Sequence, residues 1–100
     1  MRRTDFEWTV AAGHPAFSGH FPDQPIVPGV VLLDRALYFA EAVLGRPALV
    51  WEIAQTKFFS PVGPGQVLTF QLHERPDTSI AFSVLAEGCE VAAGHLRPGR

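Results

Sequence analysis

The sequence predicts an α+β fold in which one long helix lies against an antiparallel sheet of about five strands. Residues 30–44 form a long helical pattern that is apolar on almost every side, and a helix of that kind has to be covered by other elements. The rest of the chain supplies segments rich in Val, Ile, Thr and Phe, several of which alternate apolar and polar residues as half-buried strands do. A helix confined to one face of such a sheet is the α+β arrangement.

Length and composition limit the class of protein. One hundred residues suit a single domain over residues 1–100, since chains divide into domains only well beyond that length. Charged residues make up 18% of the chain, below the ~25% usual for soluble domains, which suggests a covered face such as a subunit interface. The net charge of -2 argues against a nucleic-acid binder. A single cysteine excludes an internal disulfide framework and a cysteine-rich zinc site.

Export and membrane insertion are not predicted. The first residues are basic but meet Asp5 and Glu7 before any apolar run develops, which is unlike a signal peptide. The most apolar stretch, residues 30–44, is interrupted by charged residues and falls short of the ~18 apolar residues of a membrane helix. A soluble cytoplasmic protein is therefore expected.

The chain before the helix is expected to hold a short strand and an ordered loop. Residues 6–10 have a strand-like pattern, and residues 11–28 contain prolines at positions 15, 22, 25 and 28. Prolines at this density preclude a regular helix or a central strand in the loop.

The helix has clear start and stop signals. Pro28 suits the first helical position, because its missing N–H would be unpaired there anyway. Gly45 is the expected end of the helix. At 100° per residue, Asp34 and Glu41 project about 20° apart, so they share one narrow polar stripe.

Four further strands are predicted after the helix. They are expected at residues 49–59, 66–74, 79–87 and 90–96, with turns at 61–65 and 75–78 and a hairpin loop at Gly88-Cys89. Apolar residues occupy one face of the two alternating strands, namely Leu68, Phe70 and Leu72 in the first and Ile80, Phe82, Val84 and Ala86 in the second.

The loop before the helix carries the residues best suited to chemistry. It delivers His14 and His20 beside the start of a buried helix. Unpaired N–H groups there, including that of Gly29, and the positive end of the helix dipole can hold a carbonyl oxygen as negative charge develops on it. One turn further on, Asp34 lies among apolar residues, where desolvation would favour the protonated form of a proton donor. These groups suit proton abstraction α to a carbonyl with loss of a β-hydroxyl.

Each of these residues also has a purely structural interpretation. A histidine in a proline-rich loop is often only a hydrogen-bonded structural residue, and Asp34 with Glu41 would equally form the solvated stripe of the helix. His14 and His20 suggest a metal site, but no third ligand is evident, so no metal is predicted. Cys89 lies in a turn without the surroundings of a nucleophile.

A family resemblance rests on two motifs. The first is His20-Phe21-Pro22 followed by Pro25-Ile26-Val27-Pro28-Gly29-Val30, and it resembles the active-site signature of the hot-dog-fold 3-hydroxyacyl-[acyl carrier protein] dehydratases. In that family the histidine is followed by a glycine after nine positions and by Glu or Asp after fourteen, which here are Gly29 and Asp34. The second is Lys57-Phe58-Phe59-Ser60-Pro61-Val62-Gly63-Pro64-Gly65-Gln66, which resembles the strand and turn after the family's central helix.

The resemblance implies a long central helix wrapped by a curved antiparallel sheet, with two such units pairing edge to edge in a homodimer or a higher oligomer. The active sites would lie at the dimer interface, where His20 of one chain faces Asp34 of the other. His20 would take the α-proton, Asp34 would handle the departing hydroxyl, and the amide of Gly29 would hold the thioester oxygen. No enzyme cofactor is implied.

The implied reaction converts a (3R)-hydroxyacyl thioester on an acyl carrier protein to the trans-2-enoyl thioester, in fatty-acid, aryl-polyene or polyketide-type synthesis. The short chain and the Asp at position 34 look closest to the short dehydratases of aryl-polyene-type clusters. The residues implied to contact the substrate are Phe21, Pro28, Val30, Tyr38 and Phe58.

Two positions depart from the family pattern. Asp23 stands where the family usually has glycine, and Tyr38 stands where the fatty-acid-synthesis members often have glutamine. Two alternatives therefore stay open. One is a hot-dog thioesterase, in which the same amides polarise the thioester and a carboxylate activates water. The other is a non-catalytic acyl-binding subunit of a synthase.

Overall fold

The computed structural model describes residues 2–11, 13, 26–47 and 50–99. Within these ranges the chain forms one helix and five strands. In chain order they are β1 (Arg2–Thr9), α1 (Gly29–Leu44), β2 (Trp51–Phe58), β3 (Val67–Glu74), β4 (Ile80–Ala86) and β5 (Cys89–Pro98). The predicted α+β class, with one long helix and about five strands, is confirmed.

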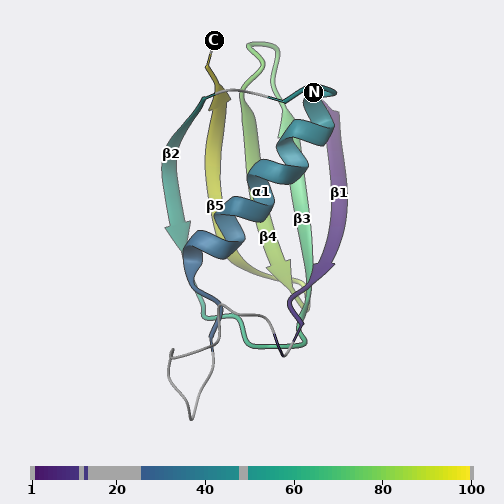
Figure 1. Ribbon diagram of the computed structural model, residues 1–100, viewed down its shortest axis with the longest axis vertical. Coiled ribbons are helices and arrows are strands. Elements are labelled where there is room, and N and C mark those ends of the chain that lie inside the picture. The colour runs from purple at the N-terminus through teal and green to yellow at the C-terminus, as the bar shows by residue number, and fades with distance from the viewer. Residues whose placement is uncertain (1, 12, 14–25, 48–49, 100) are drawn as a thin grey trace.

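The five strands form one antiparallel sheet in the order β1-β3-β4-β5-β2, so β1 and β2 are its two edges. The helix α1 lies diagonally across one face of the sheet, where it packs against β3, β4 and β5 (Figure 1). It begins beside the end of β2 and finishes on the side of β1. The start of the helix and the end of β2 are therefore brought together.

The core lies between the helix and this face of the sheet. The predicted alternation of β3 and β4 is confirmed, because the side chains expected on one face are buried there. The helix contributes its own buried stripe of Leu32, Ala36, Phe39 and Ala40. Each large apolar side chain removed from water in this way stabilises the fold by about 1.5–3 kcal/mol.

The ends of α1 agree with the sequence signals, with one shift. Pro28, with φ -58° and ψ 141°, is the residue that precedes the helix rather than its first helical residue. The prediction was wrong by one position, although proline is tolerated at both because neither position needs its N–H. The helix ends where expected, at Gly45, whose φ of 76° favours glycine and whose N–H donates to the carbonyls of Glu41 and Ala42.

All five strands differ from the predicted boundaries, by up to four residues. β1 begins four residues earlier, at Arg2, because it pairs with β3 from Arg2 opposite Glu74 to Thr9 opposite Val67. The hairpin between β4 and β5 turns at Glu87 and Gly88, not at Gly88 and Cys89. Both turn residues have positive φ, 52° and 80°, which is the type I′ geometry that matches the twist of a hairpin.

The edge strand β2 contains a bulge. Gln55 has φ 54°, and the pairing with β5 shifts between Ala54 and Lys57. Before the bulge Ile53 pairs with the buried Leu96, and after it Phe58 pairs with the buried Ala92. Residues five apart in a regular strand would point to opposite faces. The extra residue of the bulge therefore turns both Ile53 and Phe58 to the face that carries the helix.

Candidate active site

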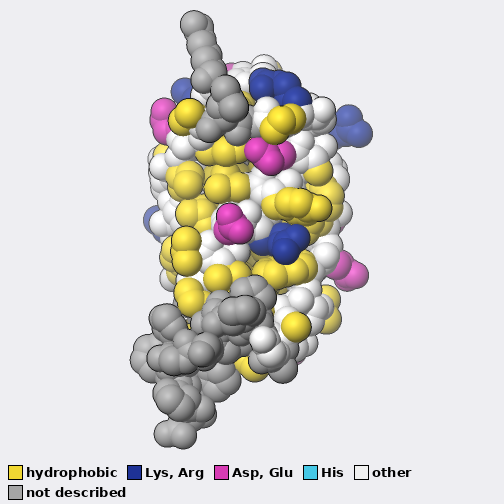
Figure 2. Space-filling model, in the orientation of Figure 1, with side chains coloured by type: hydrophobic (Ala, Val, Ile, Leu, Met, Phe, Trp, Pro, Cys, Tyr) yellow, Lys and Arg dark blue, Asp and Glu magenta, His cyan; other side chains and the backbone are white. Residues whose placement is uncertain are grey.

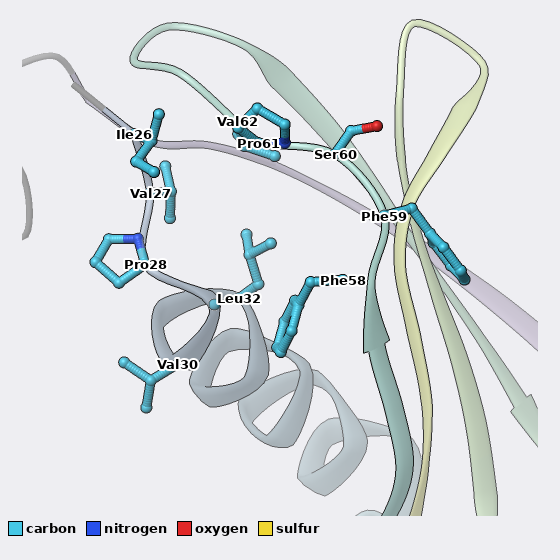
Figure 3. Close-up of a pocket in the computed structure, with 11 residues that line it drawn as sticks. Ile26, Val27, Pro28, Val30, Leu32, Phe58, Phe59, Ser60, Pro61 and Val62 are labelled. Atoms are coloured by element: carbon cyan, nitrogen blue, oxygen red, sulfur yellow. The ribbon is translucent and has the colours of Figure 1, made fainter. Parts of the chain in front are cut away.

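A hollow of about 500 Å³ lies between the start of α1 and the end of β2. Two segments line it, one just before and within the first turn of the helix and one just after β2 (Figure 3). They contribute Ile26, Val27, Pro28, Gly29, Val30 and Leu32 from the first, and Phe58, Phe59, Ser60, Pro61 and Val62 from the second. Four predicted site residues, Pro28, Gly29, Val30 and Phe58, thus line one hollow.

A backbone hydrogen bond holds the two segments together. The N–H of Val27 donates to the carbonyl oxygen of Val62 at 2.7 Å, and both side chains are buried in the core. The N–H of Phe59 donates in turn to the carbonyl of Val91 on β5 at 2.8 Å. The start of the helix is therefore fixed to the sheet through two main-chain bonds, which gives the hollow rigid walls.

The first turn of α1 offers a free amide donor. The N–H of Val31 donates to the carbonyl of Pro28 at 2.9 Å, whereas that of Gly29 meets no acceptor among the described residues. The first turn carries no acidic side chain that would neutralise the helix dipole. The Gly29 N–H can therefore polarise a carbonyl oxygen that enters the hollow.

The ring of Phe58 approaches Gly29 closely. A Cβ atom placed on Gly29 would lie 2.7 Å from Cζ and 2.9 Å from Cε1 of that ring. The absence of a side chain at Gly29 therefore makes room for the ring of Phe58. The Phe58 side chain is 50% exposed, so its ring is a wall of the hollow and not part of the core.

Asp34 lies beside a second, smaller hollow of about 270 Å³, which is lined by Trp8, Val30, Val31, Asp34 and Arg35. Because Val30 lines both hollows, they adjoin at the first turns of the helix. The Asp34 side chain is exposed in the single chain. The apolar cover that would favour its protonated form has therefore to come from outside the described residues.

Tyr38 contacts Arg35 and lines neither hollow. The guanidinium carbon of Arg35 is 4.9 Å from the centroid of the Tyr38 ring and 4.5 Å from that of Trp8 on β1. Such cation–π contacts contribute about 0.5–1 kcal/mol at exposed sites. The sequence drew no attention to Arg35, because neither its type nor its spacing signals that β1 brings an indole ring next to it.

Several predicted residues lie outside the described part of the chain. These are His14, His20, Phe21 and Asp23, so the base of the expected reaction has no position here. Among the described residues no three His, Cys, Asp or Glu side chains gather as metal ligands would. Cys89 is exposed in the hairpin. No helix in the described ranges is long and apolar enough to cross a membrane.

Curated relatives are similar in sequence to part of this chain. A 3-hydroxyacyl-[acyl-carrier-protein] dehydratase FabZ of Chlamydia trachomatis serovar L2 is 39% identical over an alignment of 71 residues. The alignment covers 62% of this chain and 46% of that protein. The chain thus spans about half the length of the curated relatives it matches.

Solved structures resemble the chain over nearly its full length. The dehydratase heterocomplex ApeI:P from Xenorhabdus doucetiae superposes with a TM-score of 0.82 at 24% identity, over 98% of this chain and 88% of that one. An uncharacterized protein from Erwinia carotovora subsp. atroseptica gives a TM-score of 0.75 at 30% identity, over 96% of this chain and 83% of that one. The helix wrapped by a five-stranded sheet is the hot-dog fold of these proteins.

A family model ties the chain to one group within that fold. The model, described as ApeI-like and ApeI dehydratase, matches residues 1–95. The match takes in the whole loop before the helix, the first turns of α1 and the strand that ends at Phe58. The chain therefore belongs to the ApeI-like dehydratase family.

Proposed function

We propose that the protein dehydrates (3R)-hydroxyacyl thioesters carried on an acyl carrier protein and releases trans-2-enoyl thioesters. The observation that carries this proposal is the N–H of Gly29, which meets no acceptor among the described residues, at an apolar hollow next to the hollow that holds the Asp34 carboxyl. Membership of the ApeI-like dehydratase family supports it. Residues 1–100 serve as one hot-dog domain in this proposal.

The reaction removes a proton from C2 and a hydroxyl from C3. The Gly29 N–H donates to the thioester oxygen and stabilises the negative charge that develops when His20 takes the C2 proton. Asp34 donates its proton to the departing hydroxyl, which leaves as water while the C2–C3 double bond forms. His20 then returns its proton to Asp34 through solvent. No cofactor takes part in these steps.

The complete site is proposed to form between two copies of the chain. β2 is an edge strand whose helix-side residues Ile53 and Phe58 are 41% and 50% exposed. The helix presents Val30 and Tyr38 beside Asp34 with little cover, and Figure 2 shows patches of apolar side chains on this face between a few charged ones. A second copy laid along β2 would cover these residues and bring its Asp34 towards His20 of the first. The homodimer is thus the active form.

The reaction can be followed directly with purified protein. The expected result is formation of an enoyl thioester from a 3-hydroxybutanoyl carrier protein, detected by its absorbance and by a mass loss of one water. His20→Ala and Asp34→Asn are each expected to lower kcat/KM by 10²–10⁴-fold, which is the usual contribution of a general acid or base. Losses below about tenfold would remove these residues from the mechanism.

The same assay separates the two alternatives. Release of a free carrier thiol without any enoyl product would identify a thioesterase. Binding of the acyl carrier protein without turnover at any chain length would identify a non-catalytic subunit. Asp23 and Tyr38, which depart from the family pattern, would then be features of that class.

A further inference from the structure

Phe58 occupies the space directly beside the Cα of Gly29, the residue whose amide is proposed to hold the thioester oxygen. Its ring points from the end of β2 toward the helix, with Pro28, Val30 and Leu32 on the other side of the hollow (Figure 3). The closest ring atom to the Cβ position of Gly29 is Cζ, the tip of the ring, at 2.7 Å. The ring therefore reaches the helix tip-first and narrows the hollow there.

The neighbouring Phe59 shows that this direction is specific to Phe58. The two rings are adjacent in the chain and equally exposed, at 50% and 52%. Phe59 also lines the hollow, but its ring points away from the helix, on the far side of its strand segment (Figure 3). The bulge at Gln55 sets this difference, because it turns Phe58 to the helix-side face of the sheet. The two phenylalanines form a natural matched pair.

We propose that Phe58 is a specificity-determining residue that rejects acyl thioesters with a substituent at C2; this inference rests on the proposed dehydration. A thioester oxygen that accepts from the Gly29 N–H lies about 2.9 Å from the nitrogen. This contact places the carbonyl carbon and C2 beside Gly29 as well. Non-bonded carbon atoms need about 3.5–4.0 Å between their centres. A methyl branch at C2 on this side would overlap the tip of the Phe58 ring.

The preferred substrates are thus 3-hydroxyacyl chains with two hydrogens at C2. A pocket that rejects one methyl group discriminates by about 10–200-fold. The rejection acts on C2 alone, because the ring tip lies at Gly29 and the rest of the hollow stays open. The length of the acyl chain beyond C3 is not restricted by Phe58.

The test compares three carrier-protein substrates, 3-hydroxybutanoyl and both C2 epimers of 2-methyl-3-hydroxybutanoyl, with the full-length protein. Wild type is expected to favour the unbranched substrate over the better epimer by at least about tenfold in kcat/KM. Phe58→Leu and Phe58→Ala are each expected to reduce this ratio at least threefold. Phe59→Leu, the matched control, is expected to leave the ratio within about twofold of wild type.

Each outcome decides the matter. The role of Phe58 is overturned, while dehydration itself stands, by any of three results. These are a wild-type ratio near 1, an unchanged ratio in Phe58→Leu, and an equal change in Phe59→Leu. Absence of turnover with all three substrates overturns the proposed dehydration and this inference with it. Circular dichroism and the thermal midpoint of each variant identify a folding defect, and the smaller change Phe58→Leu decides the question if Phe58→Ala does not fold.

Discussion

The two edges of the sheet are built very differently. At the β1 edge the ring of Phe6 stacks on Phe39 of α1, with ring centroids 4.3 Å apart and planes 7° apart. Trp8 makes an edge contact with Phe70 at 6.3 Å and carries the Arg35 guanidinium over its face. The helix and β1 thus close this edge with aromatic side chains from the same chain.

The β2 edge stays open. The helix-side residues Ile53 and Phe58 of β2 are 41% and 50% exposed. This edge adjoins the start of the helix and the larger hollow. The difference is that the described residues cover the β1 edge with aromatic side chains and leave the helix side of β2 exposed, which is where the proposed second copy would add cover.

The largest effect is expected at Asp34, the exposed carboxyl of the smaller hollow. Asp34→Asn removes the proposed proton donor and should lower kcat/KM by 10²–10⁴-fold. The free energy of unfolding should change by less than about 0.5 kcal/mol, because the side chain is exposed. Steady-state kinetics and urea unfolding measure the two quantities, and Glu41→Gln on the same stripe is the control with near wild-type kinetics. Equal losses in both variants would contradict the assignment.

Substitution at the closed β1 edge is expected to lower the free energy of unfolding, in contrast to Asp34→Asn. Phe39→Ala removes a buried ring that contacts both Phe6 and Phe70, so it should lower the free energy of unfolding by about 3–5 kcal/mol. Ile53→Ala on the open edge should cost less than half as much, because Ile53 is 41% exposed. Urea titrations at low protein concentration measure the free energy of unfolding of both variants. Similar losses for Phe39→Ala and Ile53→Ala would contradict the difference between the two edges.

The open edge should control assembly. Ile53→Lys places a charge on the apolar face of β2 and should raise the dissociation constant of the proposed dimer at least about tenfold, or about 1.4 kcal/mol. Activity should fall in step with the loss of dimer. Glu7→Lys on the exposed side of β1 is the matched control and should leave the dimer intact. Sedimentation velocity checks both, and a dimer unaffected by Ile53→Lys would place the interface elsewhere.

A smaller effect is expected at the contact between Gly29 and Phe58. In wild type, Gly29→Ala forces the Phe58 ring to move, whereas Phe58→Ala removes the three ring atoms that lie nearest to the new methyl group. The two substitutions should therefore couple by about 1 kcal/mol in a double-mutant cycle of unfolding free energies. Additive effects would show that the contact between Gly29 and Phe58 contributes nothing to the free energy of unfolding.

The sequence predicted much of this architecture and part of the site. The strict alternation in β3 and β4 and the glycine at the end of α1 report directly on burial and backbone geometry, so those elements were placed correctly. The dehydratase motifs pointed to Gly29 and Asp34, and the structure brings both to the first turns of the helix.

The errors arise where tertiary pairing overrides local signals. The first residues of β1 are polar because its outer face meets water, so nothing in their pattern marked a strand. Glu87 adopts a left-handed conformation that glutamate rarely prefers, because the pairing of Ala86 with Cys89 requires a two-residue turn there. The bulge at Gln55, which aims Phe58 at the helix, likewise depends on the register with β5.

The smallest effect is expected at the β3–β4 turn. The side-chain and main-chain hydrogen bonds that Ser79 donates to Asp77 hold the pKa of that carboxyl below its usual value of 3.8. The contribution of Asp77 to stability is therefore complete above pH 3.8 and is lost as the pH falls through the lowered folded-state pKa. Asp77→Asn should lower the thermal midpoint slightly at pH 6 and by less at pH 2.5. An equal shift at both pH values would contradict this cause.

Each active site is proposed to take His20 from one chain and Asp34 from its partner. Mixed dimers can be isolated after co-expression of His20→Ala and Asp34→Asn chains that carry different affinity tags. Such a dimer should have about half the wild-type activity, because one of its two sites keeps both residues. If the mixed dimers are no more active than either variant alone, both residues act from the same chain and the proposed site between two copies is wrong.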